Sequence, residues 1–154
     1  KYNMMDLQAA IGIHQLARVQ TSWMRRREIW DYYQQAFQEF PIILPAEPEL
    51  DTRHGLHLYT IQVDSARCNL TRDAFIEAMM TQGIGTGVHY LSIPEHHYYQ
   101  KRFGWRAEEW PTALNIGRST VSLPFSPKLT NGDLERVVAA LEKIFCKKSS
   151  CRTK

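Results

Sequence analysis

Residues 57–90, HLYTIQVDSARCNLTRDAFIEAMMTQGIGTGVHY, decide the fold class because they combine two predicted strands with a helix between them. The first eight residues, His57 to Asp64, alternate β-branched and aromatic side chains with polar ones, which is typical of a strand. Thr71 can cap a helix that runs to about Gln82. Gly83 to Tyr90 follows as a second strand, and its first glycine suits the position after the last helical turn.

The C-terminal part predicts one further strand, Ser119 to Phe125, and the most regular helix of the chain. Thr130 and Asp133 have the spacing of a capping box. Apolar residues then recur at helical spacing and predict an amphipathic helix that ends near Cys146. They are Leu134, Val137, Val138, Leu141 and Phe145.

The segment between the second and third strands favours two short helices, Pro94 to Phe103 and Trp110 to Gly117. Gly104 ends the first of them. Residues 41–55, PIILPAEPELDTRHG, form a proline-rich connector ahead of the first strand. The order is therefore long helix, strand, helix, strand, short helices, strand and helix, which indicates a small α+β sandwich.

Residues 5–40 contain no proline and a single glycine, and they predict one helix of about thirty residues with a kink near Thr21 and Ser22. Pro41 ends this helix. Its apolar residues fall in two stripes. They are Leu7, Ala10 and Ile11, and then Ile13, Leu16, Trp23, Trp30 and Phe37. So small a domain cannot bury the whole helix, so we expect it to connect two structural units or to lie across a subunit interface.

Composition and charge narrow the class of protein. The chain has 154 residues, of which 44% are hydrophobic and 23% charged, a mixture typical of one ordered globular domain. The net charge of +3 is too small to indicate a nucleic-acid partner. The sequence has no apolar run long enough to span a membrane and no signal peptide at its start. It begins without methionine, so we expect a processed product or a fragment.

Cysteine, histidine and glycine limit the possible chemistry. The three cysteines Cys68, Cys146 and Cys151 are an odd number and predict no disulfide framework, which favours a reducing cytoplasm. The six histidines are His14, His54, His57, His89, His96 and His97. None has a cysteine nearby or a zinc-site spacing, so no metal site is expected. The glycines of residues 83–87 open a strand and not a helix, which argues against a dinucleotide or phosphate loop.

Several segments in a fixed order resemble sugar aminotransferases of the DegT/StrS type, which are fold-type-I pyridoxal-phosphate enzymes of the aspartate aminotransferase superfamily. The opening KYNMMDLQAAIGIHQL, residues 1–16, resembles the segment that follows the active-site region in this family. The further matching motifs are Arg25–Ile29, His57–Tyr59, Gln82–Tyr90, Tyr98–Tyr99, Ser122–Pro124 and Leu129–Val137. The resemblance covers residues 1–146, and the ordered set is specific.

Because members of this family are more than twice as long, the resemblance implies that the chain is their C-terminal part. It implies an α+β fold, the small C-terminal domain of a fold-type-I enzyme. A long N-terminal connecting helix would precede a roughly three-stranded sheet with helices on one face. Residues 1–40 would be the end of the large domain and the connecting helix, residues 41–146 the small domain, and residues 147–154 a flexible basic tail.

The activity implied by the resemblance is transfer of an amino group from glutamate to a keto-sugar nucleotide. Pyridoxal 5'-phosphate would be the cofactor of a cytoplasmic homodimer, with no nucleic-acid or membrane partner. The Schiff-base lysine and most cofactor contacts lie upstream in the family. No catalytic residue is therefore assigned to this chain, which we expect to be inactive alone. Asn3 corresponds to a loop that approaches the cofactor phosphate of the neighbouring subunit.

The resemblance also assigns substrate-binding residues. His89 and Tyr90 match the segment that lines the sugar-nucleotide site, and His57 and Tyr59 match a segment on the strand that faces the same cleft. Many members have P-x-H after the His-Tyr pair, whereas this chain reads LSIPEHH. The histidine of that motif is replaced here or shifted by two or three positions, to His96.

Three alternatives to this activity remain open. The same fold could serve as a detached dimerisation or regulatory module, or the protein could be a sugar dehydratase relative in which histidine replaces the upstream lysine. An unrelated α+β binding domain is a third reading. The sequence does not specify the sugar, the nucleotide, the position aminated or the pathway.

Overall fold

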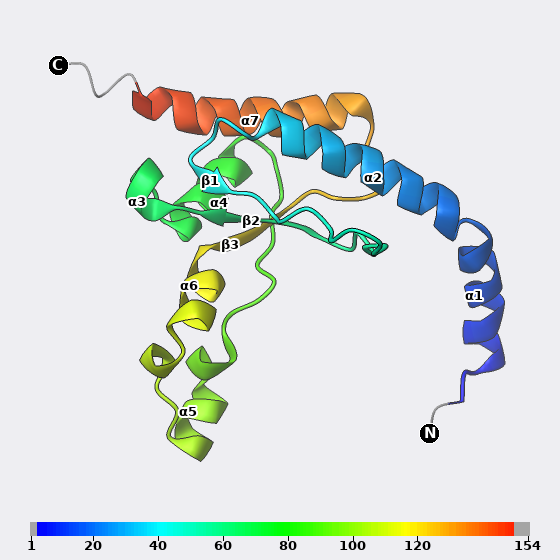
Figure 1. Ribbon diagram of the computed structural model, residues 1–154, viewed down its shortest axis with the longest axis horizontal. Helices are drawn as coiled ribbons and strands as arrows, with labels where there is room; N and C mark the ends of the chain where they lie inside the picture. The colour runs from blue at the N-terminus through cyan, green and yellow to red at the C-terminus, as the bar shows by residue number, and fades with distance from the viewer. Residues whose placement is uncertain (1–2, 150–154) are drawn as a thin grey trace.

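The computed structural model describes residues 3–149, and the side chains of residues 3–145 (Figure 1). The helices are α1 (Asp6–Ala17), α2 (Val19–Ala36), α3 (Ser65–Cys68), α4 (Arg72–Thr81), α5 (His97–Phe103), α6 (Pro111–Ser119) and α7 (Asn131–Ser149). The strands are β1 (Ile42–Ile43), β2 (Tyr59–Val63) and β3 (Thr120–Leu123). Two short 3-10 turns, η1 (Ile93–Glu95) and η2 (Ala107–Glu109), precede α5 and α6.

The three strands form one antiparallel sheet in the order β1-β2-β3. Tyr59 lies opposite Leu123 and Ile61 opposite Val121, so the central strand β2 places alternate side chains in the core. Helices α2 and α7 run side by side, and α4 packs against both α7 and the sheet (Figure 1). Helices α5 and α6 lie beyond the start of β3, on the side of the sheet away from α7 (Figure 1). The expected α+β class is therefore confirmed.

The aromatic face of α2 joins this helix to the sheet. Trp30, Tyr33 and Phe37 are almost completely buried, and all three rings lie around Tyr59. Tyr33 stacks on Phe37 with the ring centroids 4.9 Å apart, and its hydroxyl donates to the carbonyl of Pro124 at 3.1 Å. Aromatic pairs in such geometries contribute about 0.5–1.5 kcal/mol each beyond the area that they bury.

Helix α7 closes the core as its apolar spacing predicts. The buried residues of its inner face are Leu134, Val137, Ala140, Leu141 and Phe145. Thr130 Oγ1 accepts a hydrogen bond from the backbone N–H of Asp133 at 3.2 Å, and Asp133 Oδ2 accepts from the N–H of Thr130 at 3.0 Å. The capping box is therefore confirmed. The helix continues to Ser149, beyond the predicted end near Cys146, and residues 150–154 of the predicted tail lie outside the described residues.

Three other predicted helix ends are also confirmed. Thr71 Oγ1 accepts from the N–H of Ala74 at 3.2 Å and caps α4. Gly83 has φ +75° after α4, and Gly104 has φ +70° after α5, a left-handed conformation that glycine adopts without steric cost.

The predicted second strand, Gly83 to Tyr90, is wrong. Only Gly87 pairs, and it forms a single bridge with Ser122 through two backbone hydrogen bonds of 3.0 and 2.7 Å. Three glycines in this segment weaken a strand because they offer no side chains to pack. The third strand is instead β1, from the predicted connector, and Ile42 pairs with Val63. The expected strand-helix-strand crossover therefore does not form.

The predicted single long helix is also wrong, because the chain breaks at Arg18 and not near Thr21. Arg18 has φ −108° and ψ 3°, and its N–H bonds to the carbonyl of Gln15, so the α-helical pattern stops for one residue. Helix α2 then joins the core through its second half. Helix α1 has no buried residue.

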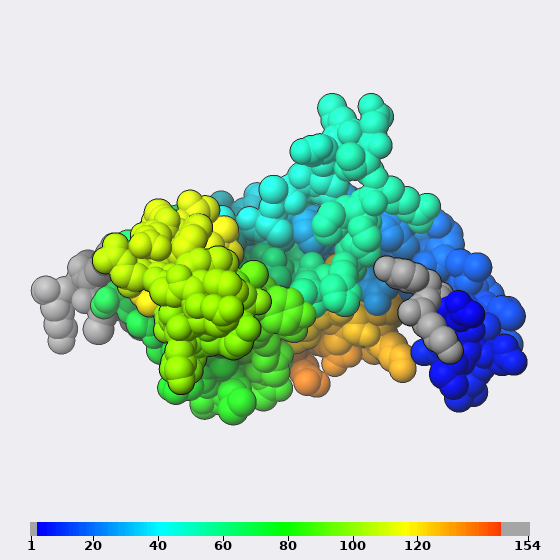
Figure 2. Space-filling model, turned by 90° about the horizontal axis from the view of Figure 1, so that it is seen from below, coloured from blue at the N-terminus to red at the C-terminus, as the bar shows by residue number. Residues whose placement is uncertain are grey.

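Helix α1 carries many apolar side chains, and none of them is buried. Leu7 and Leu16 are 71% and 72% exposed, and Ile11 and Ile13 are also exposed. Exposed apolar side chains that are gathered on one helix mark an interface with other protein. The connector also projects from the body (Figure 2), with Leu50 94% exposed near its tip. Within residues 3–149, no helix is both long and apolar enough to cross a membrane.

We expect the 154-residue chain to associate with itself through α1, because no other described segment buries this helix. Changing Ile13 and Leu16 to lysine should reduce the association and leave the free energy of unfolding unchanged, since both side chains are exposed. Sedimentation velocity over a concentration series measures the effect. The matched control is Leu50→Lys, which should change nothing. A wild-type chain that stays monomeric at high concentration, with α1 protected from hydrogen exchange, would contradict the expectation.

Candidate functional site

The side chain of His89 is held against the sheet by Ser122, the residue that forms the bridge with Gly87. Its Nδ1 atom lies 2.8 Å from Oγ of Ser122, which is in β3 and only 5% exposed. The glycine bridge between Gly87 and Ser122 brings the two residues together. The result is a half-buried imidazole that is anchored at one nitrogen.

Tyr90 is next to this imidazole and is open to solvent. Its ring meets the ring of His89 edge to face with the centroids 5.0 Å apart, and 73% of the residue is exposed. Tyr90 therefore does not pack in the core of the described chain. An imidazole and a phenol side by side can both exchange hydrogen bonds with sugar hydroxyls or diphosphate oxygens.

Tyr59 does not face a cleft, contrary to the expectation. Its ring is fully buried at the centre of the core, and its hydroxyl donates to Oε1 of Gln34 at 3.3 Å. The alternation along β2 is the physical reason, because Tyr59, Ile61 and Val63 all point into the core. This phenol is already bonded inside the chain and presents no surface to a substrate.

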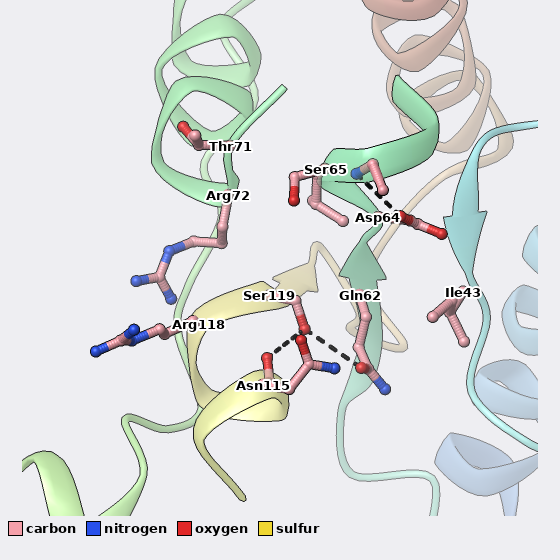
Figure 3. A pocket seen from close by; sticks show the side chains of 11 residues that line it. Ile43, Gln62, Asp64, Ser65, Thr71, Arg72, Asn115, Arg118 and Ser119 are labelled. Carbon is pink, nitrogen blue, oxygen red and sulfur yellow. Dashed lines mark hydrogen bonds between the residues drawn. The ribbon is translucent and has the colours of Figure 1, made fainter. Parts of the chain in front are cut away.

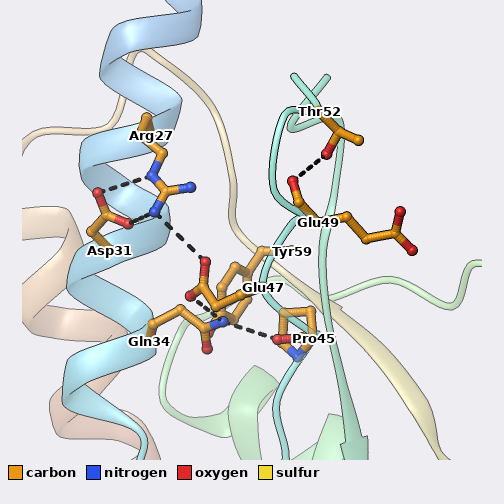
Figure 4. A network of polar contacts seen from close by, with 8 residues as sticks. All are labelled: Arg27, Asp31, Gln34, Pro45, Glu47, Glu49, Thr52 and Tyr59. Carbon is orange, nitrogen blue, oxygen red and sulfur yellow. Dashed lines mark hydrogen bonds and ion pairs between the residues drawn. The ribbon is translucent and has the colours of Figure 1, made fainter. Parts of the chain in front are cut away.

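The polar contacts above Tyr59 tie the connector to α2 (Figure 4). Gln34 Nε2 donates to the carbonyl of Pro45 at 2.9 Å and to Glu47 Oε1 at 3.0 Å. Arg27 lies between two carboxylates, with 2.8 Å to Asp31 and 3.6 Å to Glu47. This network is structural, since every member bonds another part of the same domain.

The other predicted site residues lie apart from the His89 pair. His57 is exposed just before β2, and His96 is exposed at the start of α5, with its ring 6.5 Å from that of Tyr99. Asn3 is exposed ahead of α1. Among the described residues, the structure places neither His57 nor His96 in hydrogen-bond or ring contact with His89.

Sequence reasoning missed Ser122 as a site residue. The sequence singled it out only as part of the Ser-Leu-Pro motif, and 33 residues separate it from His89. No local signal marks it, because the register of the two segments decides which of their polar residues meet. The bridge between Gly87 and Ser122 supplies that register.

A separate polar cavity of about 390 Å³ lies between α4, α6 and β2 (Figure 3). Arg72 and Arg118 extend toward the same side of it. Both are already partnered: Arg118 Nε donates to Glu95 Oε1 at 2.8 Å, and Arg72 Nη1 donates to the carbonyl of Gly117 at 3.2 Å. A hydrogen bond from Ser92, followed by those from Arg118, lowers the pKa of the Glu95 carboxyl. Arg72 also pairs with Asp73, and Arg118 pairs with Glu95, so both guanidinium charges are already matched by carboxylates and the cavity is not a ready anion site.

Comparison with known proteins identifies the family. A model described as the DegT/DnrJ/EryC1/StrS aminotransferase family matches residues 1–142. The chain therefore belongs to this family, and the resemblance given by its ordered motifs is confirmed.

Individual relatives agree with this assignment. The chain is 41% identical over 145 residues to the spore coat polysaccharide biosynthesis protein SpsC of Bacillus subtilis (strain 168), and the match covers 94% of this chain and 37% of SpsC. Its fold matches Spr1654 of Streptococcus pneumoniae, described as a sugar aminotransferase, with a TM-score of 0.86 and 26% identity over 99% of this chain and 38% of that one. Spr1654 has also been solved in PMP and PLP forms.

A third relative is S. venezuelae DesV, solved in complex with a ketimine intermediate, with a TM-score of 0.78 and 26% identity over 88% of this chain and 35% of that one. The chain thus spans little more than a third of the length of these relatives. Its folded core corresponds to one part of a larger enzyme fold.

The two buried tyrosines predict how stability depends on alkaline pH. Burial raises the pKa of the Tyr33 and Tyr59 phenols well above their usual range near 10. Above about pH 10 the unfolded chain loses these protons while the folded chain keeps them, so the free energy of unfolding should fall as pH rises. Changing Tyr59 to phenylalanine should make that fall shallower. Urea unfolding at about pH 8 and about pH 11 measures the slope.

The control for this experiment is Tyr98→Phe, which removes an exposed phenol and should leave the slope as it is in the wild type. A Tyr59→Phe chain whose stability falls with pH as steeply as that of the wild type would show that the buried phenol does not carry this linkage.

Proposed function

We propose that this chain is the C-terminal part of a pyridoxal-phosphate enzyme that moves an amino group from glutamate to a keto-sugar nucleotide. The observation that carries the proposal is the family match over residues 1–142, since it includes nearly every folded element. The similarity to a polysaccharide biosynthesis protein supports a sugar substrate. The open His89 and Tyr90 pair supplies polar groups suited to one.

The described residues do not themselves fit the cofactor. The lysines whose side chains the structure describes, Lys101, Lys128 and Lys143, are all exposed on the surface. A lysine that holds pyridoxal phosphate must instead be desolvated in a pocket, where its amine is activated. The chemistry of an electron sink would therefore come from the remainder of the enzyme, and this chain would bind and orient the sugar nucleotide.

Within this proposal, His89 and Tyr90 hold the acceptor substrate by its oxygens. Neutral imidazole and phenol groups can do this without burying a net charge. His57 and His96 would approach the same substrate from the rims of neighbouring elements, which their exposure permits. Asn3 would contact the cofactor phosphate of a second subunit. Tyr59 is left out of the site because it is buried.

The proposal also includes a homodimer located in the cytoplasm. The uncovered apolar helix α1 supports the existence of a protein interface, since its exposed leucines and isoleucines need cover. The free thiol of Cys68 is compatible with a reducing compartment. An N-terminal loop ahead of α1 would then lie near the partner's site, which would couple dimerisation to activity.

We expect this chain alone to form no specific covalent complex with pyridoxal phosphate, because its described lysines are solvated surface groups. The chain is mixed with the cofactor, reduced with borohydride and mapped by mass spectrometry. Scattered, substoichiometric labelling is expected. One lysine labelled at a ratio of one per chain would contradict this, since it would mean that the chain contains a complete cofactor site.

In the intact enzyme, His89→Ala should impair the half-reaction with the keto-sugar nucleotide more than the half-reaction with glutamate. The loss of one uncharged hydrogen bond predicts about a three- to tenfold loss of kcat/KM for the sugar nucleotide. The control is His97→Ala, which removes a solvent-exposed histidine and should change neither half-reaction. Equal losses in both half-reactions for His89→Ala would argue against a substrate role.

A further inference from the structure

We propose that Ser122 is a positioning residue for His89, so that the imidazole presents its Nε2 atom to an oxygen of the sugar nucleotide. The inference rests on the proposed function of His89. It adds a residue from β3 that neither the family motifs nor the comparisons assign to the site.

The first support is the fixed place of the Ser122 hydroxyl. Ser122 pairs with Thr60 on the central strand, and its backbone makes both hydrogen bonds of the bridge to Gly87. Its residue is 5% exposed, and Oγ lies 2.8 Å from Nδ1 of His89. An anchor that is part of the sheet cannot follow the ring if the ring rotates. The bond therefore selects one orientation of the imidazole.

The second support is the space that Gly87 leaves for the ring. A Cβ atom at this position would lie 2.9 Å from Cε1 of His89, closer than real Cβ contacts. The imidazole thus occupies the space beside Gly87 that the side chain of any other residue would fill, and such a side chain would displace the ring. The edge of Tyr90, with the ring centroids 5.0 Å apart, confines the imidazole on another side.

These contacts leave one nitrogen of the imidazole for a ligand. Nδ1 is engaged by Ser122, while Nε2 has no hydrogen-bond partner among the described residues. A serine hydroxyl can donate or accept, so it satisfies Nδ1 in either neutral tautomer. Nε2 can correspondingly accept from a sugar hydroxyl or donate to a diphosphate or carbonyl oxygen. Holding the ring in advance reduces the entropy lost when the ligand binds.

The test measures kcat and KM for the two half-reactions of the intact enzyme. Ser122→Ala should raise KM for the sugar nucleotide about three- to tenfold, the loss expected for one hydrogen bond, with the glutamate half-reaction unchanged. Ser122→Thr keeps the hydroxyl and should restore most of the loss. The matched control is Thr120→Val, which removes another buried hydroxyl from β3 without touching His89 and should change neither half-reaction.

A double-mutant cycle separates positioning from a direct or merely structural role. Because Ser122 acts through the imidazole, Ser122→Ala should cause no further rise in KM when His89 is already alanine. Gly87→Ala should give the same selective loss with the hydroxyl present, and it too should be silent without the imidazole. The Gly87→Ala variant also keeps the inference testable if Ser122→Ala does not fold.

Losses that add fully in the double variants would overturn the inference, as would a Ser122→Ala enzyme with the wild-type KM while His89→Ala is impaired. In that second case the proposed function of His89 would stand. A His89→Ala enzyme with an unchanged KM for the sugar nucleotide would overturn both the inference and the role proposed for His89.

Discussion

The packing of α2 onto Tyr59 is the constraint on which the rest of the domain depends. Trp30 and Tyr33 each pack against this ring in a T-shaped contact, and the pairing of β2 with β3 fixes the strand that carries it. Its hydroxyl bonds Gln34, which also bonds the connector at Pro45. The buried side chain of Tyr59 thus joins α2, the sheet and the connector. The register that it fixes extends along β3 to Ser122 and so to His89.

Local sequence signals predicted the elements that are stabilised locally. The Thr130 and Asp133 box, the Thr71 cap and the left-handed Gly83 are each determined within a few residues, and all were found. The presence of a three-stranded sheet was predicted, but one of its three strands was assigned to the wrong segment. Ile42 and Ile43 form a strand because the edge of β2 lies beside them, which is a tertiary fact, while glycine deprives residues 83–90 of the packing that a strand needs.

The site shows the same division. The His89 and Tyr90 pair could be selected from the sequence through family resemblance. Tyr59 could not be rejected until the structure showed that its face of β2, shared with Ile61 and Val63, is buried. Ser122 was invisible as a site residue because its contact depends on a bridge between distant segments. The break at Arg18 was missed for a related reason. Nothing in the residues around it forbids a continuous helix.

The proposal that this chain is one part of a sugar aminotransferase is tested most directly by following the nitrogen atom. The intact enzyme is incubated with glutamate labelled with heavy nitrogen and a set of keto-sugar nucleotides, and the products are analysed by mass spectrometry. The expected product is a sugar nucleotide in which the carbonyl oxygen has been replaced by a labelled amino group. A sugar nucleotide that has lost water and gained no labelled nitrogen, or no nitrogen transfer to any keto-sugar nucleotide, would contradict it.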